Sequence, residues 1–177
     1  PPTKMGALPT MIRLILKIGI EKIGLIVFGT GASEKNGLKE AVYTKKYLLE
    51  NVHRLREFDA INPYSFLQQQ DSLNDLLATI VPEIQSQNTL EEIRNAAHLF
   101  AEAGIESVLQ ISCGSHSPRC LRDRLIAGTP IHQEWYMVAD DTFFPGTTAK
   151  DVVIIEPPHR GDDPMINAQL KPHELVP

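Results

Sequence analysis

The stretch that decides the fold runs from residue 86 to residue 127 and reads SQNTLEEIRNAAHLFAEAGIESVLQISCGSHSPRCLRDRLIA. Its first part places apolar residues at helical spacing, and Gly104 supplies a left-handed stop for that helix. Ser107–Ser112 is a short apolar run of the kind that forms a buried strand. Pro118 suits the first turn of a second helix, over residues 118–127. The stretch therefore predicts a helix, a strand and a helix in succession.

The same alternation continues on both sides of this stretch. Apolar residues recur at helical spacing in residues 11–22 and 38–51, and short strand-like runs occupy residues 23–28, 135–139 and 152–155. Strands that alternate with helices form parallel βαβ units. The chain is therefore predicted to be an α/β protein, and more specifically a three-layer α/β/α Rossmann-like domain with a mostly parallel sheet.

The middle of the chain interrupts this alternation. Residues 58–75 combine Asn62-Pro63 with three successive glutamines and show no firm period. We interpret them as an irregular insertion, with a short helix at residues 73–80. The length of 177 residues suits one domain, so residues 1–177 are predicted to form a single α/β unit.

The composition excludes several classes of function. A formal net charge of -5 argues against a nucleic-acid partner, because proteins that bind nucleic acids usually carry a basic surface. No apolar run approaches the ~20 residues that a membrane-spanning helix needs. Cys113 and Cys120 do not make a disulfide framework, and they suit a reducing compartment. We therefore expect a cytoplasmic protein with a small-molecule ligand.

Polar and ionisable residues gather at the predicted strand ends. In open parallel sheets, ligands bind beyond the carboxyl ends of the strands, where the fold itself brings these ends together. The ends here are residues 29–33, 112–116, 140–141 and 156–160. They contain glycines, hydroxyls, histidines, arginines and carboxylates, so we expect the ligand site to lie among them.

The first strand end combines Gly29, Thr30 and Gly31, whose amides and hydroxyl can face an anionic group. No Gly-Lys-Ser/Thr follows, and the third glycine of a dinucleotide fingerprint is misplaced, so neither phosphate motif is present. A tight turn that requires glycine is the alternative interpretation. Glu40 lies near the start of the next helix, where it can orient a hydroxyl or a water. The alternative for Glu40 is a carboxylate that the helix dipole favours.

Ser86, Asn88 and Thr89 stand at the start of another predicted helix. Thr89 and Glu92 form a capping box, in which the Thr89 hydroxyl accepts a hydrogen bond from the Glu92 amide. A helix start that carries hydroxyl and amide side chains can also hold an anionic group. Ser86, Asn88 and Thr89 are therefore candidate ligand-binding residues, and capping alone is the alternative.

The loop after Ser107–Ser112 holds the most suggestive residues. His116 follows a glycine-containing strand end, and Arg119 comes one helical turn later, an arrangement suited to proton transfer beside a bound anion. We assign His116 as the candidate acid/base, and Ser115 and Arg119 as ligand-binding residues. A hydrogen-bonding structural histidine is the alternative. Cys113 as a nucleophile with His116 as its base is a further alternative, but their closeness on one loop is awkward for that role.

Ionisable residues also gather near the end of the sequence. Residues 156–163 read EPPHRGDD, which supplies side chains that can bind a metal ion. They lack any specific ligand spacing, and the adjacent prolines indicate a rigid turn with a solvated surface. We therefore assign no metal site.

Three of these segments together resemble the YdcF/SanA/ElyC family. They are residues 25–48 (LIVFGTGASEKNGLKEAVYTKKYL), 86–92 (SQNTLEE) and 108–119 (VLQISCGSHSPR), and they occur in the family's order across roughly residues 23–127. The residues that match the family's motifs are Glu40, Ala41, Ser86, Asn88, Thr89, Glu91, His116 and Arg119.

The chain also departs from the family pattern. Residues 29–31 (Gly-Thr-Gly) replace Ser-Gly-Gly, and residues 115–116 (Ser-His) replace Tyr-His. The asparagine that follows the glutamate in the family is displaced, which weakens the match at Glu91. The family's first strand, with its own glycine-rich loop, would precede Met11 and is not visible in the sequence.

The resemblance implies a YdcF-like small-molecule protein that binds a nucleotide- or phosphate-bearing ligand at the strand ends. It suggests S-adenosylmethionine as the cofactor and a hydrolase or transferase reaction as the activity, with His116 as acid/base and Glu40 beside it. The alternative is a non-catalytic ligand-binding or interaction protein of envelope or secondary metabolism, with residues 58–75 as the partner surface.

Overall fold

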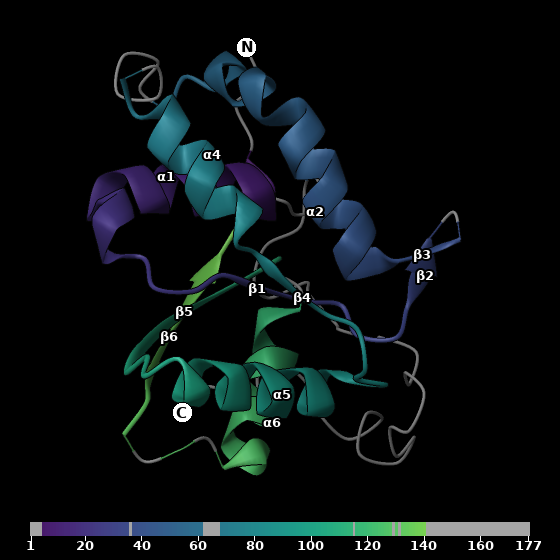
Figure 1. The fold of residues 1–177 in the computed structure, drawn as a ribbon. Coiled ribbons are helices and arrows are strands. Elements are labelled where there is room, and N and C mark those ends of the chain that lie inside the picture. The colour runs from purple at the N-terminus through teal and green to yellow at the C-terminus, as the bar shows by residue number, and fades with distance from the viewer. Residues whose placement is uncertain are drawn as a thin grey trace.

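Helices and short strands alternate in the computed structural model (Figure 1), which describes residues 5–35, 37–61, 68–114, 116–128, 130 and 132–140. The helices are α1 (Ala7–Ile18), α2 (Glu40–Asn51), α4 (Gln70–Ala78), α5 (Thr89–Glu102) and α6 (Ser117–Ala127), with 3-10 turns η1 (Ile20–Lys22) and η2 (Val52–Glu57). The strands are β1 (Val27–Gly29), β2 (Glu34–Lys35), β3 (Leu38–Lys39), β4 (Val81–Glu83), β5 (Ser107–Ser112) and β6 (Glu134–Ala139).

The described strands pair in three two-stranded sheets. β1 runs parallel to β4, with Val27 opposite Val81. β5 runs parallel to β6 along its whole length, and β2 and β3 form a small antiparallel hairpin. The predicted α/β class is therefore confirmed, and the pairing of β1 with β4 and of β5 with β6 is parallel. The described strands do not join into one sheet.

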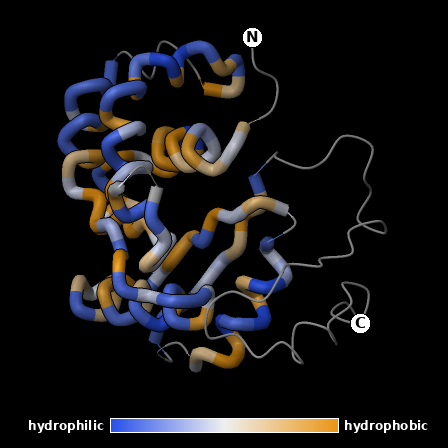
Figure 2. Tube along the Cα trace, turned by 90° about the vertical axis from the view of Figure 1, so that its right-hand side faces the viewer, coloured by the Kyte–Doolittle hydropathy of each residue, from blue (hydrophilic) through white to orange (hydrophobic). Residues whose placement is uncertain are grey.

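The helices lie on two sides of the strands (Figure 1). α1, α2 and α4 cover one side, while α5 and α6 pack against each other on the other side. Figure 2 shows hydrophobic residues concentrated in the strands and on the helix faces that turn toward them. Burial of these faces is the main force that holds the helices on the strands.

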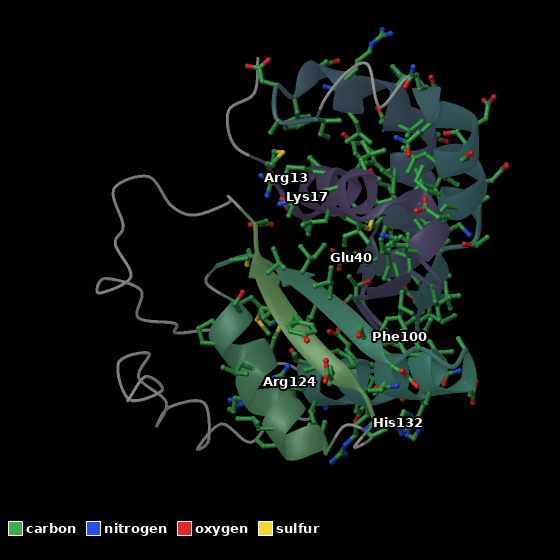
Figure 3. All side chains as sticks on the ribbon, turned by 90° about the vertical axis from the view of Figure 1, so that its left-hand side faces the viewer. Arg13, Lys17, Glu40, Phe100, Arg124 and His132 are labelled. Atoms are coloured by element: carbon green, nitrogen blue, oxygen red, sulfur yellow. The ribbon has the colours of Figure 1, made fainter. Side chains whose placement is uncertain are left out.

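Two apolar regions hold the elements together. The larger one lies on the α1 side, where Ile12 is 0% exposed and packs in one cluster with Ile15 and Leu73. The smaller one lies under α5, where Phe100 (labelled in Figure 3) meets Trp135 of β6 edge to face, with ring centroids 6.0 Å apart. An edge-to-face contact of this kind suits the charge distribution of aromatic rings.

Several elements end at other residues than the sequence predicts. α1 begins at Ala7 and ends before Gly19, whose φ of 108° turns the chain out of the helix, so the predicted helix over residues 11–22 is wrong at both ends. β1 covers Val27–Gly29 rather than residues 23–28. Residues 38–39 pair as β3 instead of beginning the predicted helix.

The sequence does not predict β4, because a central proline usually argues against a strand. The Val81 amide donates to the Ile26 carbonyl at 2.9 Å, so the odd-numbered residues of β4 bond to β1. The nitrogen of Pro82 therefore faces away from β1, where the ladder needs no N–H group. This is why a proline is tolerated at the centre of so short a strand.

The N-cap of α5 also differs from the predicted one. The Asn88 side chain accepts a hydrogen bond from the Glu91 amide at 3.0 Å, and Glu91 in turn accepts one from the Gln87 amide at 2.8 Å. The reciprocal pair thus lies one residue before the predicted Thr89–Glu92 pair. The predicted capping box is wrong in register, and the Glu92 side chain is not needed for capping.

The predicted insertion at residues 58–75 is partly helical. α4 begins at Gln70, before the predicted helix start at residue 73, and ends at Ala78. Residues 62–67 lie outside the described part of the chain, as do the predicted strand at 152–155 and the ionisable residues 156–163. Among the described residues, no helix has both the length and the apolar character needed to cross a membrane.

Candidate functional site

A cleft of about 900 Å³ opens where the loop after β1 meets the start of α2, the turn after β4 and the starts of α5 and α6. Most of the predicted site residues line it, although they come from distant parts of the sequence: Gly29, Thr30, Glu40, Ser86, Asn88, Thr89 and His116. The cleft has further lining residues: Ala32, Ser33 and Gln87 belong to the segments expected at the site, Glu92 is expected only as a capping residue, and Glu34 and Lys39 are not singled out by the sequence.

The other predicted residues lie elsewhere. Gly31 and Arg119 are not among the residues that line the cleft, and Ser115 lies outside the described part of the chain. Cys113, the alternative nucleophile, does not line the cleft either. Direct ligand contacts by Gly31, Ser115 and Arg119 therefore stay predictions.

Gly31 shapes the wall of the cleft. Its φ is 59°, and a Cβ atom at this position would collide with the carbonyl oxygen of Ser86. The Ala32 amide donates a hydrogen bond to that same oxygen at 2.6 Å. The loop after β1 is thus fixed against the turn after β4, and only glycine fits at the point of closest approach.

Glu83, the last residue of β4, holds the opposite wall. Its Oε1 accepts hydrogen bonds from the amides of Gln85 at 2.8 Å and Ser86 at 3.1 Å, and from Asn95 Nδ2 at 3.2 Å. Asn95 also donates to the Ser86 hydroxyl at 3.0 Å. The Glu83 side chain therefore connects α5 to the turn that carries Ser86. The sequence offers little signal for this role, because the proline before Glu83 conceals the strand.

Glu92 is the most perturbed ionisable group of the cleft. Its pKa is raised from 4.5 to about 7, mainly by burial and then by the nearby carboxylates of Glu83 and Glu40, while Arg119 opposes the shift. A carboxyl group with this pKa is about half protonated at neutral pH, so it can donate or accept a proton. The available sequence signal is that Glu92 sits beside Ile93 on the inner face of α5.

His116 stands at the N-cap position of α6 and lines the cleft together with Glu92. Its backbone amide donates to the Cys113 carbonyl at 3.0 Å, and its own carbonyl accepts from the Cys120 amide at 3.1 Å. These backbone bonds place the residue firmly at the strand end. His116 and Glu92 thus both border the cleft, as the two members of a general acid/base pair must.

Arg119 lies within α6, behind the wall of the cleft. It is 5% exposed, and its Nε is 3.8 Å from Oδ2 of Asp123, which is 2% exposed. Arg119 nevertheless reaches the cleft electrostatically, because its charge lowers the pKa of Glu92. In the described structure it acts as a fixed charge behind the wall.

The charge at the surface of the cleft is negative. Glu34, Glu40 and Glu92 line it. Lys39 is already held, since its Nζ lies 2.9 Å from Glu34 Oε1 and donates to the Ala32 carbonyl at 3.0 Å. Glu40, labelled in Figure 3, begins α2, and its backbone amide donates to the Ser33 carbonyl. Within the described residues, no group of His, Cys, Asp or Glu side chains is arranged to hold a metal ion.

Comparisons with known proteins add no family: no family model matches the chain, and neither the curated proteins nor the solved structures contain a significant match.

Proposed function

We propose that the chain binds a small nucleoside-bearing molecule in the cleft and acts on it as a hydrolase or transferase. The convergence of Glu40, Ser86, Glu92 and His116 on one cleft of about 900 Å³ carries this proposal. Clefts with few convergent polar groups and a perturbed carboxyl are the usual sites of ligand binding and catalysis. The proposal includes a three-layer Rossmann-like domain with its ligand at the strand ends, and a cytoplasmic location.

The ligand class follows from the charge of the cleft. A phosphate group would lie beside the Glu40 carboxylate and the partly ionised Glu92 carboxyl, because Lys39 and Glu34 offset each other in their ion pair. S-adenosylmethionine carries a sulfonium cation instead, which carboxylates attract. Of the ligands that the family resemblance implies, we therefore favour S-adenosylmethionine, which would supply an electrophilic methyl group.

One buried polar atom of the cleft lining, the Thr30 hydroxyl, supports a ligand in this region. The Thr30 hydroxyl and Oε2 of Glu83 have no hydrogen-bond partner among the described residues. Buried polar atoms without partners are rare, and a bound molecule is one common reason for them. Thr30 lines the cleft and can bond a ligand hydroxyl, while the negative charge of Glu83 adds to the attraction for a cation.

The chemistry of the chain's own residues is proton transfer. Glu92 in its neutral form can donate a proton to a leaving group, and in its ionised form it can take one from an attacking hydroxyl. His116 supplies the second acid/base group. Glu40 begins α2 at the cleft and can orient a hydroxyl or a water.

Titration calorimetry with S-adenosylmethionine, S-adenosylhomocysteine and ATP tests the ligand class. The first two differ by the sulfonium methyl group and its charge, so S-adenosylmethionine should bind about tenfold more tightly or better, and ATP should bind weakest. Glu40→Gln should weaken the binding of S-adenosylmethionine and reduce the difference between its affinity and that of ATP. Tighter binding of ATP, with no effect of Glu40→Gln, would contradict the proposal.

A non-catalytic interaction protein is the second candidate function. It is favoured by apolar side chains at the end of α6, where Leu125 is 73% exposed and Ile126 is 53% exposed. Product analysis after incubation with each bound ligand separates the two candidates. A binder saturates and is stabilised by the ligand without converting it, whereas an enzyme consumes it.

A further inference from the structure

A hollow of about 170 Å³ lies beside the cleft, between α5 and β5. We name it the α5–β5 hollow. Four residues line both the hollow and the cleft, namely Gly29, Thr89, Glu92 and His116. The hollow therefore adjoins the cleft, and these four residues mark the junction between the two spaces.

The walls of the hollow are aliphatic and aromatic away from this junction. Ile93, Ala96 and Phe100 line it from α5, where their spacing puts them on one face of the helix. Trp135 lines it from β6, and its ring is held in place because its Nε1 donates to Oε1 of Gln133 at 3.1 Å. Walls of this kind suit a flat ring, which gains contact area and aromatic interactions there.

The size of the hollow limits what can enter it. An apolar cavity of ~150 Å³ holds a benzene ring in another protein. The α5–β5 hollow is of similar size and adjoins a cleft of about 900 Å³. One flat ring system therefore fits in the hollow, while the rest of a nucleoside would remain in the cleft.

Gln110 supplies a polar side chain to these walls. Val108 lies opposite Trp135 in the register of β5 and β6, so their side chains share the face of the sheet on which Trp135 meets Phe100 of α5. Every second side chain of a strand lies on the same face. The Gln110 side chain therefore lies on the face that α5 covers.

The carboxamide oxygen of Gln110 is buried and has no hydrogen-bond partner among the described residues. Buried polar atoms of this kind are rare, and a donor from a bound molecule removes the cost of leaving one unpaired. A glutamine carboxamide pairs with adenine in particular: its oxygen accepts from the ring amino group, and its nitrogen donates to the adjacent ring nitrogen N7.

We propose that the α5–β5 hollow holds the adenine ring of the ligand and that Gln110 reads the ring amino group. This inference rests on the proposed function, because it places one part of the S-adenosylmethionine that we favour there. Gln110 lines only the hollow, and Glu40 lines only the cleft. The ring and the sulfonium group would thus lie at opposite ends of the site, with the ribose at the junction beside Glu92 and His116.

Two pairs of probes test the assignment in the wild-type protein. S-adenosylmethionine and S-inosylmethionine differ only in the ring, where an oxygen replaces the amino group, and adenosine and inosine differ in the same way. Because the oxygen cannot donate to Gln110, the adenine member of each pair should bind about tenfold more tightly. Titration calorimetry measures the first pair. Emission of Trp135, the only tryptophan of the chain, follows the second pair, with excitation beyond the absorption of the bases.

Gln110→Leu should remove the preference for adenine in both pairs. The variant should fold, because the buried oxygen that it loses has no partner in the described structure. Gln68→Leu makes the same change at an exposed position just before α4 and should keep the wild-type preference. A preference for adenine that survives in Gln110→Leu overturns the assignment of this residue.

Ala96→Leu tests whether the ring enters the hollow. The larger side chain fills part of the space that Ala96 lines, so both members of each pair should bind at least tenfold less tightly. Ala103→Leu is the matched control at the exposed end of α5 and should bind them normally. Unchanged binding in Ala96→Leu overturns the proposal. If Ala96→Leu does not fold, the probe pairs and Gln110→Leu decide.

The two pairs keep this inference distinguishable from the proposed function. Tight binding of S-adenosylmethionine with equal binding within both pairs overturns the adenine site and leaves the proposed ligand standing. A preference for adenosine over inosine that requires Gln110, without binding of S-adenosylmethionine, supports the adenine site and contradicts the proposed ligand. Absence of binding by all four probes overturns both.

Discussion

Glu92 lies in the first turn of α5, where a sequence-based view expects an ordinary ionised carboxylate. Its pKa of about 7 has causes that only the folded chain supplies, namely burial and the approach of Glu83 and Glu40 from β4 and α2. Glu92 is therefore the residue whose surroundings say most about the chemistry of the cleft. Its titration should also make the free energy of unfolding depend on pH.

Glu92→Gln should stabilise the protein at alkaline pH. The pKa of Glu92 is raised from 4.5 to about 7 in the folded state, so its ionisation opposes folding and stability falls as pH rises through this window. The glutamine variant lacks this loss. Its free energy of unfolding should exceed that of the wild type by up to ~3 kcal/mol above about pH 8. Near pH 4 the two proteins should have similar free energies of unfolding.

Urea unfolding at both pH values measures this difference. Glu102→Gln, at the last residue of the same helix and exposed, is the matched control and should follow the wild type at each pH. A constant difference between Glu92→Gln and wild type across the pH range would show that burial does not perturb the Glu92 carboxyl.

Gly31 and Gly37 form a second matched pair. Both have a positive φ, of 59° and 76°, but only Gly31 lies against the Ser86 carbonyl. Gly37→Ala should cost about 1 kcal/mol of unfolding free energy from backbone strain alone. Gly31→Ala adds a collision to this strain and should cost ~3 kcal/mol or more. Equal losses in thermal or urea unfolding would mean that the loop moves away from Ser86 without penalty.

At the scale of elements, α5 connects most parts of the molecule. Its N-terminal turn lines the cleft, and the helix packs against α6, β1 and β4. Its amphipathic pattern and the stop at Gly104, whose φ is 70°, are confirmed as the sequence predicts them. Its cap is the part that sequence reasoning places wrongly, because Ser, Asn and Thr near one helix start are all good N-cap residues.

Asn88→Ala should therefore destabilise the protein by about 1 kcal/mol through loss of the hydrogen bond from the Glu91 amide. Gln87→Ala changes the preceding exposed side chain and keeps the backbone bond to Glu91, so its effect should be small. Chemical unfolding of both variants checks this. Similar losses in the two would show that Asn88 does not cap α5.

At the scale of the whole molecule, the site forms because the carboxyl ends of the paired strands lie next to the same cleft. Parallel pairing puts the carboxyl ends of β1 and β4 together, and it does the same for β5 and β6. α5 and α6 then bring the two pairs to one cleft. This explains why Glu40, Ser86 and His116 could be grouped from the sequence: the topology of alternating strands and helices already implies their proximity.

The sequence by itself determined the α/β class, the strand Ser107–Ser112, the helices around it and most of the residues that line the cleft. These features follow from local periodicity and from the rule that parallel strands end together. Only the tertiary structure decided the pKa of Glu92, the tie between Glu83 and Asn95, and the buried position of Arg119. Each of these depends on distances between residues that are far apart in the chain, and burial and Coulomb interactions are set by those distances rather than by sequence spacing.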